Sequence, residues 1–266
     1  MDDRDVLKGR IKTLSQRALN ESFLTHTSFL SLSEQSMFFS ILKEEHVSLL
    51  NEKYAGVSYF LYGGHEDDDR KIIYFLPYYL SKEETLFKES NGETFSCLHV
   101  YPKNIKFSDD LSHRDYLGAL MHLGIKREMY GDILSDGKQA YIFILNGVIE
   151  DVKENLTKVK HTIVESEIIK PKDCPFKMKF KEMNINIASV RLDCIIAEVF
   201  HLSRRDSQVL IANENVFVNG MTMMNNSYSP KENDRISIKG KGKFIFVSIG
   251  NISRKGRLFV KVKLYC

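Results

Sequence analysis

Apolar residues at the start of the chain recur every three or four positions, the spacing of a helix with one buried face. This pattern covers residues 4–19 and 33–50, and Ser31 with Glu34 can form a capping box ahead of the second stretch. The pattern predicts an N-terminal helical segment over residues 1–55.

The pattern then changes to runs of aromatic and β-branched residues, which are typical of strands. In VSYFLYGGHEDDDRKIIYFLP two such runs flank a turn rich in glycine and aspartate, and they predict a hairpin. The strands FSCLHVYP, QAYIFIL and HTIVESEII follow, with one helix over SHRDYLGALMHLGI, capped by Ser112, and another near residues 147–156. This mixture predicts a central α+β sandwich over residues 56–169, with helices on one face of a sheet.

The stretch KPKDCPFKMKFKEMN, residues 170–184, has few apolar residues and contains two of the five prolines, so we interpret it as a linker. Beyond it, residues 191–200 and 203–212 predict two short helices. VFVNGMTM centres on Asn219-Gly220, the pair that favours a type I′ hairpin turn. RISIKG, KFIFVSIG and RLFVKVKLY predict more strands, so residues 185–266 are expected to form a small domain of two helices and a sheet. The expected fold class of the whole chain is α+β.

The net charge of +3 conceals an uneven distribution. Residues 184–266 contain 13 Lys and Arg against 6 Asp and Glu, a net charge of +7, whereas residues 1–183 carry −4. Positive charge concentrated in this way favours nucleic acid or an anionic membrane surface as a partner, although a solvated basic surface also explains it.

No stretch approaches the roughly 18 apolar residues that span a bilayer, so we expect a cytoplasmic protein that does not enter membranes. The four cysteines lie far apart in the sequence, without the spacing of a zinc site or a disulfide framework, and we expect reduced thiols. They are Cys97, Cys174, Cys194 and Cys266.

Three short motifs resemble sites of chemistry, and each has a simpler interpretation. His113-Arg114-Asp115 matches part of a kinase catalytic loop, but the other kinase motifs are missing, and these residues suit the first turn of a helix. GGHEDDDR can bind a hard metal ion, yet it lacks the spaced ligands of a calcium loop and suits a solvated hairpin tip. KGKGKF has Phe where a phosphate loop needs Ser or Thr. We therefore expect no catalytic residues, no metal site, no cofactor and no small-molecule substrate.

Arg204 and Arg205 follow Ser203 at the start of a predicted helix, where positive charge opposes the helix dipole by a few tenths of a kcal/mol. A helix start capped by serine presents backbone N–H groups that suit a phosphate. Alternatively, both arginines reach solvent or pair with Asp193 and Asp206. The local sequence leaves these two interpretations open.

Over residues 188–240 the order V-RLD-x-x-I-A … L-S-R-R … V-F-V-N-G … Y … N-D-x-I-S-I-K-G resembles the S-four type RNA-binding domain, also called the αL domain. The resemblance implies a helix pair on a small twisted sheet whose basic face binds structured RNA. Asp193 and Asn219-Gly220 match its structural positions, whereas Glu214 and Asn233 stand where the family usually has glycine. The implied RNA-binding residues are Arg191, Ser203, Arg204 and Arg205, with Lys239, Lys241 and Lys243 as weaker candidates.

Upstream, YGGHEDDDRKIIYFLP, SHRDYLGALMHLGIKREMYGDI and QAYIFILNGVIEDVKENLTKV resemble the YlmH family of bacterial proteins, so the resemblance covers nearly the whole chain. It implies a non-enzymatic RNA-binding protein whose central domain is similar to RNA-recognition folds. The implied partners are ribosomal RNA, tRNA and the large ribosomal subunit carrying peptidyl-tRNA, and the implied process is ribosome-associated quality control of stalled translation. We expect a monomer.

Two alternatives to this function remain. Pseudouridine synthases carry the same small domain, but their catalytic domain has its own Arg-Leu-Asp motif, and the only one here is Arg191-Leu192-Asp193. The second alternative is an adaptor in cell division, docking through the acidic residues 1–183. The aromatic residues of the hairpin can stack on bases, although alternating aromatics more often form a core; they are Tyr59, Phe60, Tyr74 and Phe75.

Overall fold

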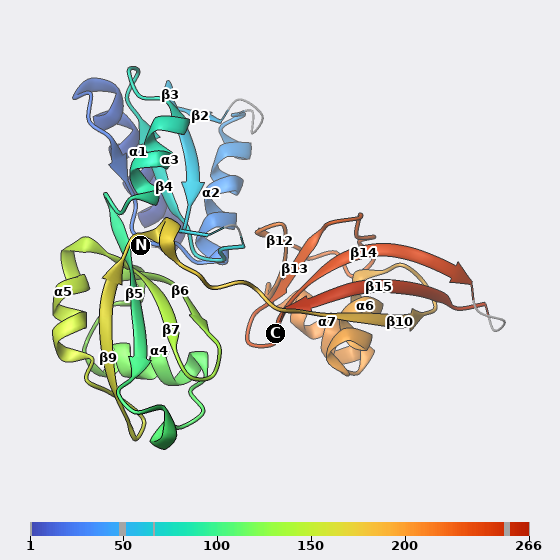
Figure 1. Ribbon diagram of the computed structural model, residues 1–266. Helices are drawn as coiled ribbons and strands as arrows, with labels where there is room; N and C mark the ends of the chain where they lie inside the picture. The colour runs from blue at the N-terminus through green and yellow to red at the C-terminus, as the bar shows by residue number, and fades with distance from the viewer. Residues whose placement is uncertain (1, 48–51, 66, 253–255, 266) are drawn as a thin grey trace. The chain divides into compact units, whose positions relative to one another are not determined.

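The computed structural model describes residues 2–47, 52–65, 67–252 and 256–265 (Figure 1). The chain divides into two compact units, Met1–Phe176 and Lys177–Cys266. Helices and antiparallel sheets occur in both units, so the predicted α+β class is confirmed. None of the helices in the described ranges is long and apolar enough to cross a membrane.

The first unit opens with a lobe in which two helices pack on a four-stranded antiparallel sheet of order β1-β4-β3-β2. The capping box predicted ahead of the second helix is present, because Ser31 N donates to Glu34 Oε2 at 2.7 Å and Glu34 N donates to Ser31 Oγ at 3.3 Å. That helix ends at Glu44, and residues 48–50 of its predicted range lie outside the described residues. The elements are α1 (Asp3–Asn20), β1 (Thr25–His26), α2 (Leu32–Glu44), β2 (Lys53–Tyr54), β3 (Val57–Tyr62), β4 (Ile72–Leu76) and α3 (Lys82–Ser90).

The hairpin of β3 and β4 belongs to this lobe and not to the central sheet. Its side chains share one apolar core with Leu7 and Ile11 of α1 and Phe38 of α2. A boundary at residues 55/56 would therefore cut through a packed lobe. Every residue of β4 is buried, so the sequence pattern of this strand could not show which helices cover it. The hairpin aromatics Tyr59, Phe60, Tyr74 and Phe75 are at most 4% exposed and form core rather than a platform for bases.

The second lobe is a five-stranded sheet of order β6-β7-β5-β9-β8. Without the short β8, this is the strand order of the split β-α-β arrangement found in ferredoxin-like folds, with one helix after the first strand and one after the third. The predicted cap of α4 is formed by Ser112 and Asp115, which supports the simpler interpretation of the His-Arg-Asp triplet. The elements are β5 (Phe95–Pro102), η2 (Ile105–Phe107), α4 (His113–His122), η3 (Arg127–Met129), β6 (Tyr130–Ser135), β7 (Ala140–Leu145), α5 (Asn146–Asn155), β8 (Lys158–Val159), β9 (Thr162–Ile169) and η4 (Pro171–Asp173).

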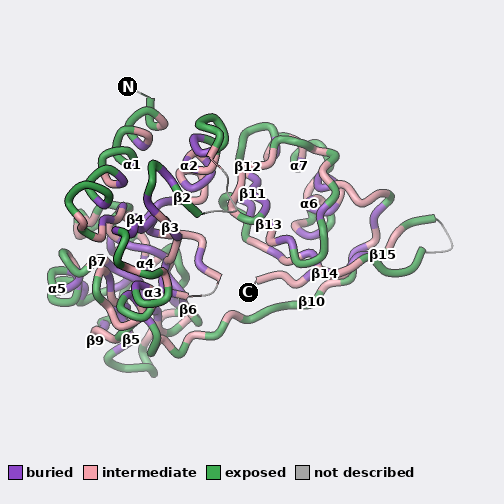
Figure 2. Tube along the Cα trace, turned by 90° about the horizontal axis from the view of Figure 1, so that it is seen from above, coloured by how far each residue is buried: buried purple, intermediate pink, exposed green. Residues whose placement is uncertain are grey.

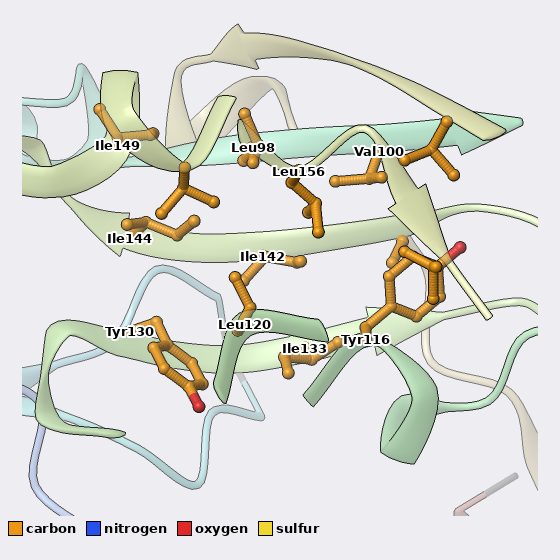
Figure 3. Close-up of a cluster of buried hydrophobic side chains, with 14 of the residues drawn as sticks. Leu98, Val100, Tyr116, Leu120, Tyr130, Ile133, Ile142, Ile144, Ile149 and Leu156 are labelled. Carbon is orange, nitrogen blue, oxygen red and sulfur yellow. The ribbon is translucent and has the colours of Figure 1, made fainter. Parts of the chain in front are cut away.

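Alternating residues of the two middle strands point toward both helices and form the core of this lobe (Figure 3). Leu98 of β5 and Ile142 of β7 are fully buried, with Leu120 of α4 and Ile149 of α5 in the same cluster. Strand alternation therefore leaves the other set of β5 and β7 side chains on the opposite face of the sheet.

The opposite face packs in part against the first lobe. The Phe29 and Phe95 rings lie 5.2 Å apart, and His65 stacks on Phe143 at 5.5 Å. Glycine permits this approach: Gly64 has φ +113°, and a Cβ there would collide with the Phe143 ring, while a Cβ on Gly131 would lie 2.6 Å from Phe29. The two lobes of the first unit are thus fitted closely together.

Residues 63–65 and 67–70 of the run GGHEDDDR lie at this junction, so its interpretation as a solvated hairpin tip is wrong for them; Glu66 lies outside the described residues. Asp68 is buried and its carboxylate lies 3.0 Å from Lys71 Nζ; burial raises its pKa to about 6, although Lys71 opposes the shift. His65 Nε2 lies 3.2 Å from Asp132 Oδ2, and Asp69 N donates to the same oxygen at 2.7 Å. Within the described parts of the chain, no three His, Cys, Asp or Glu side chains gather as a metal site.

The second unit places two helices against a six-stranded antiparallel sheet of order β10-β15-β14-β13-β11-β12. Asn219 and Gly220 connect β11 to β12 with φ +51° and +81°, so the predicted type I′ turn is confirmed.

Cys194 of this unit is a free thiol, as are Cys97 and Cys174 of the first, and Cys266 lies outside the described residues. The elements are β10 (Phe180–Ile187), α6 (Leu192–Phe200), α7 (Arg204–Ala212), β11 (Val216–Val218), β12 (Met221–Thr222), β13 (Arg235–Ile238), β14 (Gly242–Ile252) and β15 (Leu258–Tyr265).

The predicted linker is too long at its end, because residues 180–184 form the first part of β10 and pair with β15. This part of the strand is largely exposed, as Figure 2 shows, and its side chains are mostly polar. A strand with so little burial lacks the alternation by which the sequence pattern detects strands.

Candidate nucleic-acid interface

A buried carboxylate joins the starts of the two helices of the second unit. Asp193, the second residue of α6, is fully buried and accepts hydrogen bonds from Arg191 Nε and Nη2, both at 3.0 Å. Its Oδ2 atom also accepts from Arg204 Nε at 3.2 Å and from Gln208 Nε2 at 2.9 Å, both on α7. Of the predicted RNA-binding residues, the structure therefore brings Arg191 and Arg204 together.

These bonds decide the charge of the carboxylate. Burial of Asp193 favours the neutral acid, but hydrogen bonds from Arg191, Gln208 and Arg204 more than offset burial and hold the pKa of Asp193 well below its ordinary value. The site therefore contains a permanent anion that fixes two cations, the arrangement that a buried charge requires.

Both guanidinium groups still face solvent. The side chains of Arg191 and Arg204 are 32% and 57% exposed. A guanidinium has five N–H donors, and the bonds to Asp193 occupy two of Arg191 and one of Arg204. The remaining donors are held in fixed directions at the surface, where they can bind an anion such as a phosphate.

The start of α7 shows the partners of the residues around the arginine pair. Ser203 Oγ accepts from Asp206 N at 3.0 Å and donates to the Asp206 carboxylate at 2.7 Å. The Asp206 carboxylate therefore interacts favourably with the positive end of the helix dipole. Arg204 pairs with Asp193, one of the two carboxylates that the sequence offered it. Ser203 is engaged in the cap, whereas Arg205 is exposed beside it.

Lys239 and Lys241 lie in the turn between β13 and β14, and Lys243 is the second residue of β14; none of the three is part of the Asp193 cluster. Lys239 N donates to Asn215 O at 2.9 Å, which anchors the turn, and the Lys239 and Lys241 side chains are exposed. Lys243 is half-buried, with Nζ 4.7 Å from the centre of the Tyr265 ring. Lys239 and Lys241 are therefore better placed than Lys243 to meet a ligand.

The motif residues Asn219, Tyr228 and Asp234 form a second network, which is structural. Asp234 accepts from Asn219 Nδ2 at 2.8 Å and from the Tyr228 hydroxyl at 2.9 Å. Burial, together with Asp234, raises the pKa of Tyr228 to about 12. The sequence analysis missed Gln208 as a hydrogen-bond donor to Asp193. Its spacing of four residues from Arg204, which places both on one face of a helix, could have indicated it.

Glu214 adopts the conformation that glycine accepts readily, with φ +57°, and Asn233 has φ +69°. A left-handed backbone costs most non-glycine residues about 1–2 kcal/mol, and asparagine less. We expect Glu214→Gly to stabilise the second unit by about 0.5–1 kcal/mol, since the entropy of the new glycine in the unfolded chain cancels part of the gain. Hydrogen exchange of residues 177–266 measures this, with Asn233→Gly as the matched variant of smaller effect. Faster exchange in Glu214→Gly would contradict the assignment of strain.

The fold and this site define a class of α+β proteins that combine a ferredoxin-like lobe with a basic unit. At the surface of that unit, a buried aspartate fixes two arginines. Residues 97–173 match the family model described as the putative RNA-binding domain in YlmH. Over this stretch the chain is similar to the YlmH family. Ribosome-associated protein quality control protein P2 of Bacillus subtilis (strain 168) is 28% identical over 207 residues, which are 76% of this chain and 76% of that protein. The structure of cell division protein ylmH from Streptococcus pneumoniae has a TM-score of 0.45 and 18% identity, covering 62% of this chain and 87% of that one.

Proposed function

We propose that this chain is an RNA-binding, ribosome-associated factor without enzymatic activity. In this proposal it binds the large ribosomal subunit carrying peptidyl-tRNA and acts in the cytoplasm in quality control of stalled translation. The second unit acts as an S-four type domain, and its exposed arginines contact phosphates of ribosomal RNA or tRNA.

The observation that carries the proposal is the pair of guanidinium groups that the buried Asp193 fixes at the surface of the second unit, in which residues 184–266 carry a net charge of +7. Fixed donors lose little entropy on binding, and Arg matches phosphate geometry better than Lys does. The family match over residues 97–173 adds a second region named for RNA binding, and the Bacillus relative is named for ribosome-associated quality control.

Sedimentation of a cell lysate on a sucrose gradient tests the proposal. We expect the full chain to travel with the large subunit, and to leave it when puromycin releases the nascent chains before lysis. A chain that stays at the top of the gradient would instead favour an adaptor, and a chain that stays on subunits after puromycin would remove the peptidyl-tRNA requirement.

A further inference from the structure

The strand β5 runs toward one end of the second lobe (Figure 1). Residues 103–110 and 158–163 form this end, here called the tip. Two hydrogen bonds hold the segments together: Lys103 N donates to the backbone oxygen of Ile163 at 3.0 Å, and His161 N donates to the side-chain atom Asp109 Oδ2 at 3.1 Å. The tip is therefore one defined surface of the lobe.

Large apolar side chains project from the tip into solvent. Phe107 is 84% exposed and Ile105 is 71% exposed, both on the short helix η2, and Ile163 on the neighbouring strand is exposed as well. Asn104 caps this helix by accepting from Lys106 N at 3.1 Å. Exposed apolar residues gathered on an ordered turn indicate a binding surface more strongly than the same residues scattered singly.

Four lysines belong to the same two segments as these apolar side chains, and most carboxylates near them accept hydrogen bonds or pair with a lysine within the protein. Asp109 accepts from His161 N and Thr162 Oγ1, while Asp115 caps α4 and lies 3.0 Å from Lys160 Nζ. Asp110 is exposed at the far end of the loop, and Lys103 has an exposed partner, Glu165, at 3.1 Å. Exposed pairs of this kind are weak and a phosphate can displace the carboxylate. The lysines of the tip are Lys103, Lys106, Lys158 and Lys160.

The face of the sheet without helices is a poorer place for RNA. Its inner part is covered by Phe29 and His65 of the first lobe. Phe176 lies 6.2 Å from Tyr141, ring to ring, and Tyr141 is itself buried. The strip of β9 beside it carries Glu165 and Glu167, which repel phosphate. An RNA that contacts this lobe can therefore meet an exposed aromatic ring, Phe107, and cations at the tip.

We propose that the tip binds an unpaired RNA base by stacking it on Phe107, with Lys103 and Lys106 contacting the flanking phosphates. Aromatic rings recognise bases in single-stranded loops and bulges, where the face of the base is free. The inference rests on the proposed RNA-binding function and names a second contact for it, separate from the arginines of the second unit.

Retention of protein-free large-subunit ribosomal RNA by the full chain tests the proposal. We expect Phe107→Ala to weaken binding about tenfold with an unchanged salt slope, because stacking is not ionic. Phe107→Trp should retain the affinity, whereas Lys103→Gln with Lys106→Gln should flatten the salt dependence. The matched control is Phe87→Ala, which removes a ring that is 70% exposed on α3 in the other lobe and should change nothing.

The outcomes separate the two proposals. One outcome is that Phe107→Ala binds RNA as tightly as the wild type, whereas the double variant Arg204→Ala with Arg205→Ala binds more weakly. That outcome would overturn the proposed RNA contact at the tip and leave the proposed function standing. A wild-type chain that retains no RNA would overturn both. If Phe107→Ala weakens binding to intact large subunits but not to their protein-free RNA, the tip binds a protein and the inference is wrong.

Discussion

Replacing Arg204 and Arg205 together with alanine is expected to weaken RNA binding by a few tens-fold at about 0.1 M salt. Each lost phosphate contact removes roughly 0.7–0.9 units from the slope of log affinity against log salt, so two contacts should flatten the slope by about 1.5 units. The loss should shrink toward high salt, where counterion release contributes less. Filter retention of structured ribosomal RNA or tRNA across a salt series measures both quantities.

A matched variant separates this local effect from a change in net charge. Arg10→Ala with Arg17→Ala removes the same charge from α1, where both side chains are about half exposed and lie near carboxylates. We expect this control to leave the affinity and the salt slope nearly unchanged. Equal losses in both double variants would mean that only the overall charge matters, and unchanged binding in the Arg204 and Arg205 variant would place the RNA surface elsewhere.

Local chemistry explains which features could be predicted from the sequence. The capping box at Ser31, the cap at Ser203 and the turn at Asn219-Gly220 depend on residues within four positions of one another, so the sequence states them directly. Glu214 stands where the resembling family usually has glycine, and its backbone is left-handed, the conformation that glycine accepts readily.

Features that depend on tertiary packing were not predictable. The sequence allowed Arg204 to pair with Asp193 or Asp206, and only the crossing of α6 and α7 places Arg191, Arg204 and Gln208 around one oxygen pair. The same reason applies to the GGHEDDDR run, whose burial requires the second lobe to be docked on the first. Strand patterns identify a hairpin without identifying the helices that will cover it.

Asp193→Asn is expected to destabilise the second unit by about 2–4 kcal/mol. An amide keeps the shape of the carboxylate but offers one acceptor oxygen and places N–H donors against the arginines, so buried donors lose their partners. Because the pKa of Asp193 is lowered in the folded protein, its ionisation stabilises the fold above the unfolded value of roughly 4, and this contribution is lost as pH falls through the lower folded value. Hydrogen exchange of residues 177–266 should therefore show less acid dependence in the variant.

The same variant distinguishes a positioning role for Asp193 from a purely electrostatic one. Removing a negative charge from a basic surface should tighten RNA binding if only charge matters. We expect weaker binding instead, because Arg191 and Arg204 lose the anion that fixes their direction and must be ordered when RNA binds. Glu198→Gln removes the same charge from α6, from an exposed carboxylate that accepts from Arg257, and should tighten binding slightly. If both variants tighten binding equally, the arginines act as mobile charges and their fixed geometry contributes nothing to recognition.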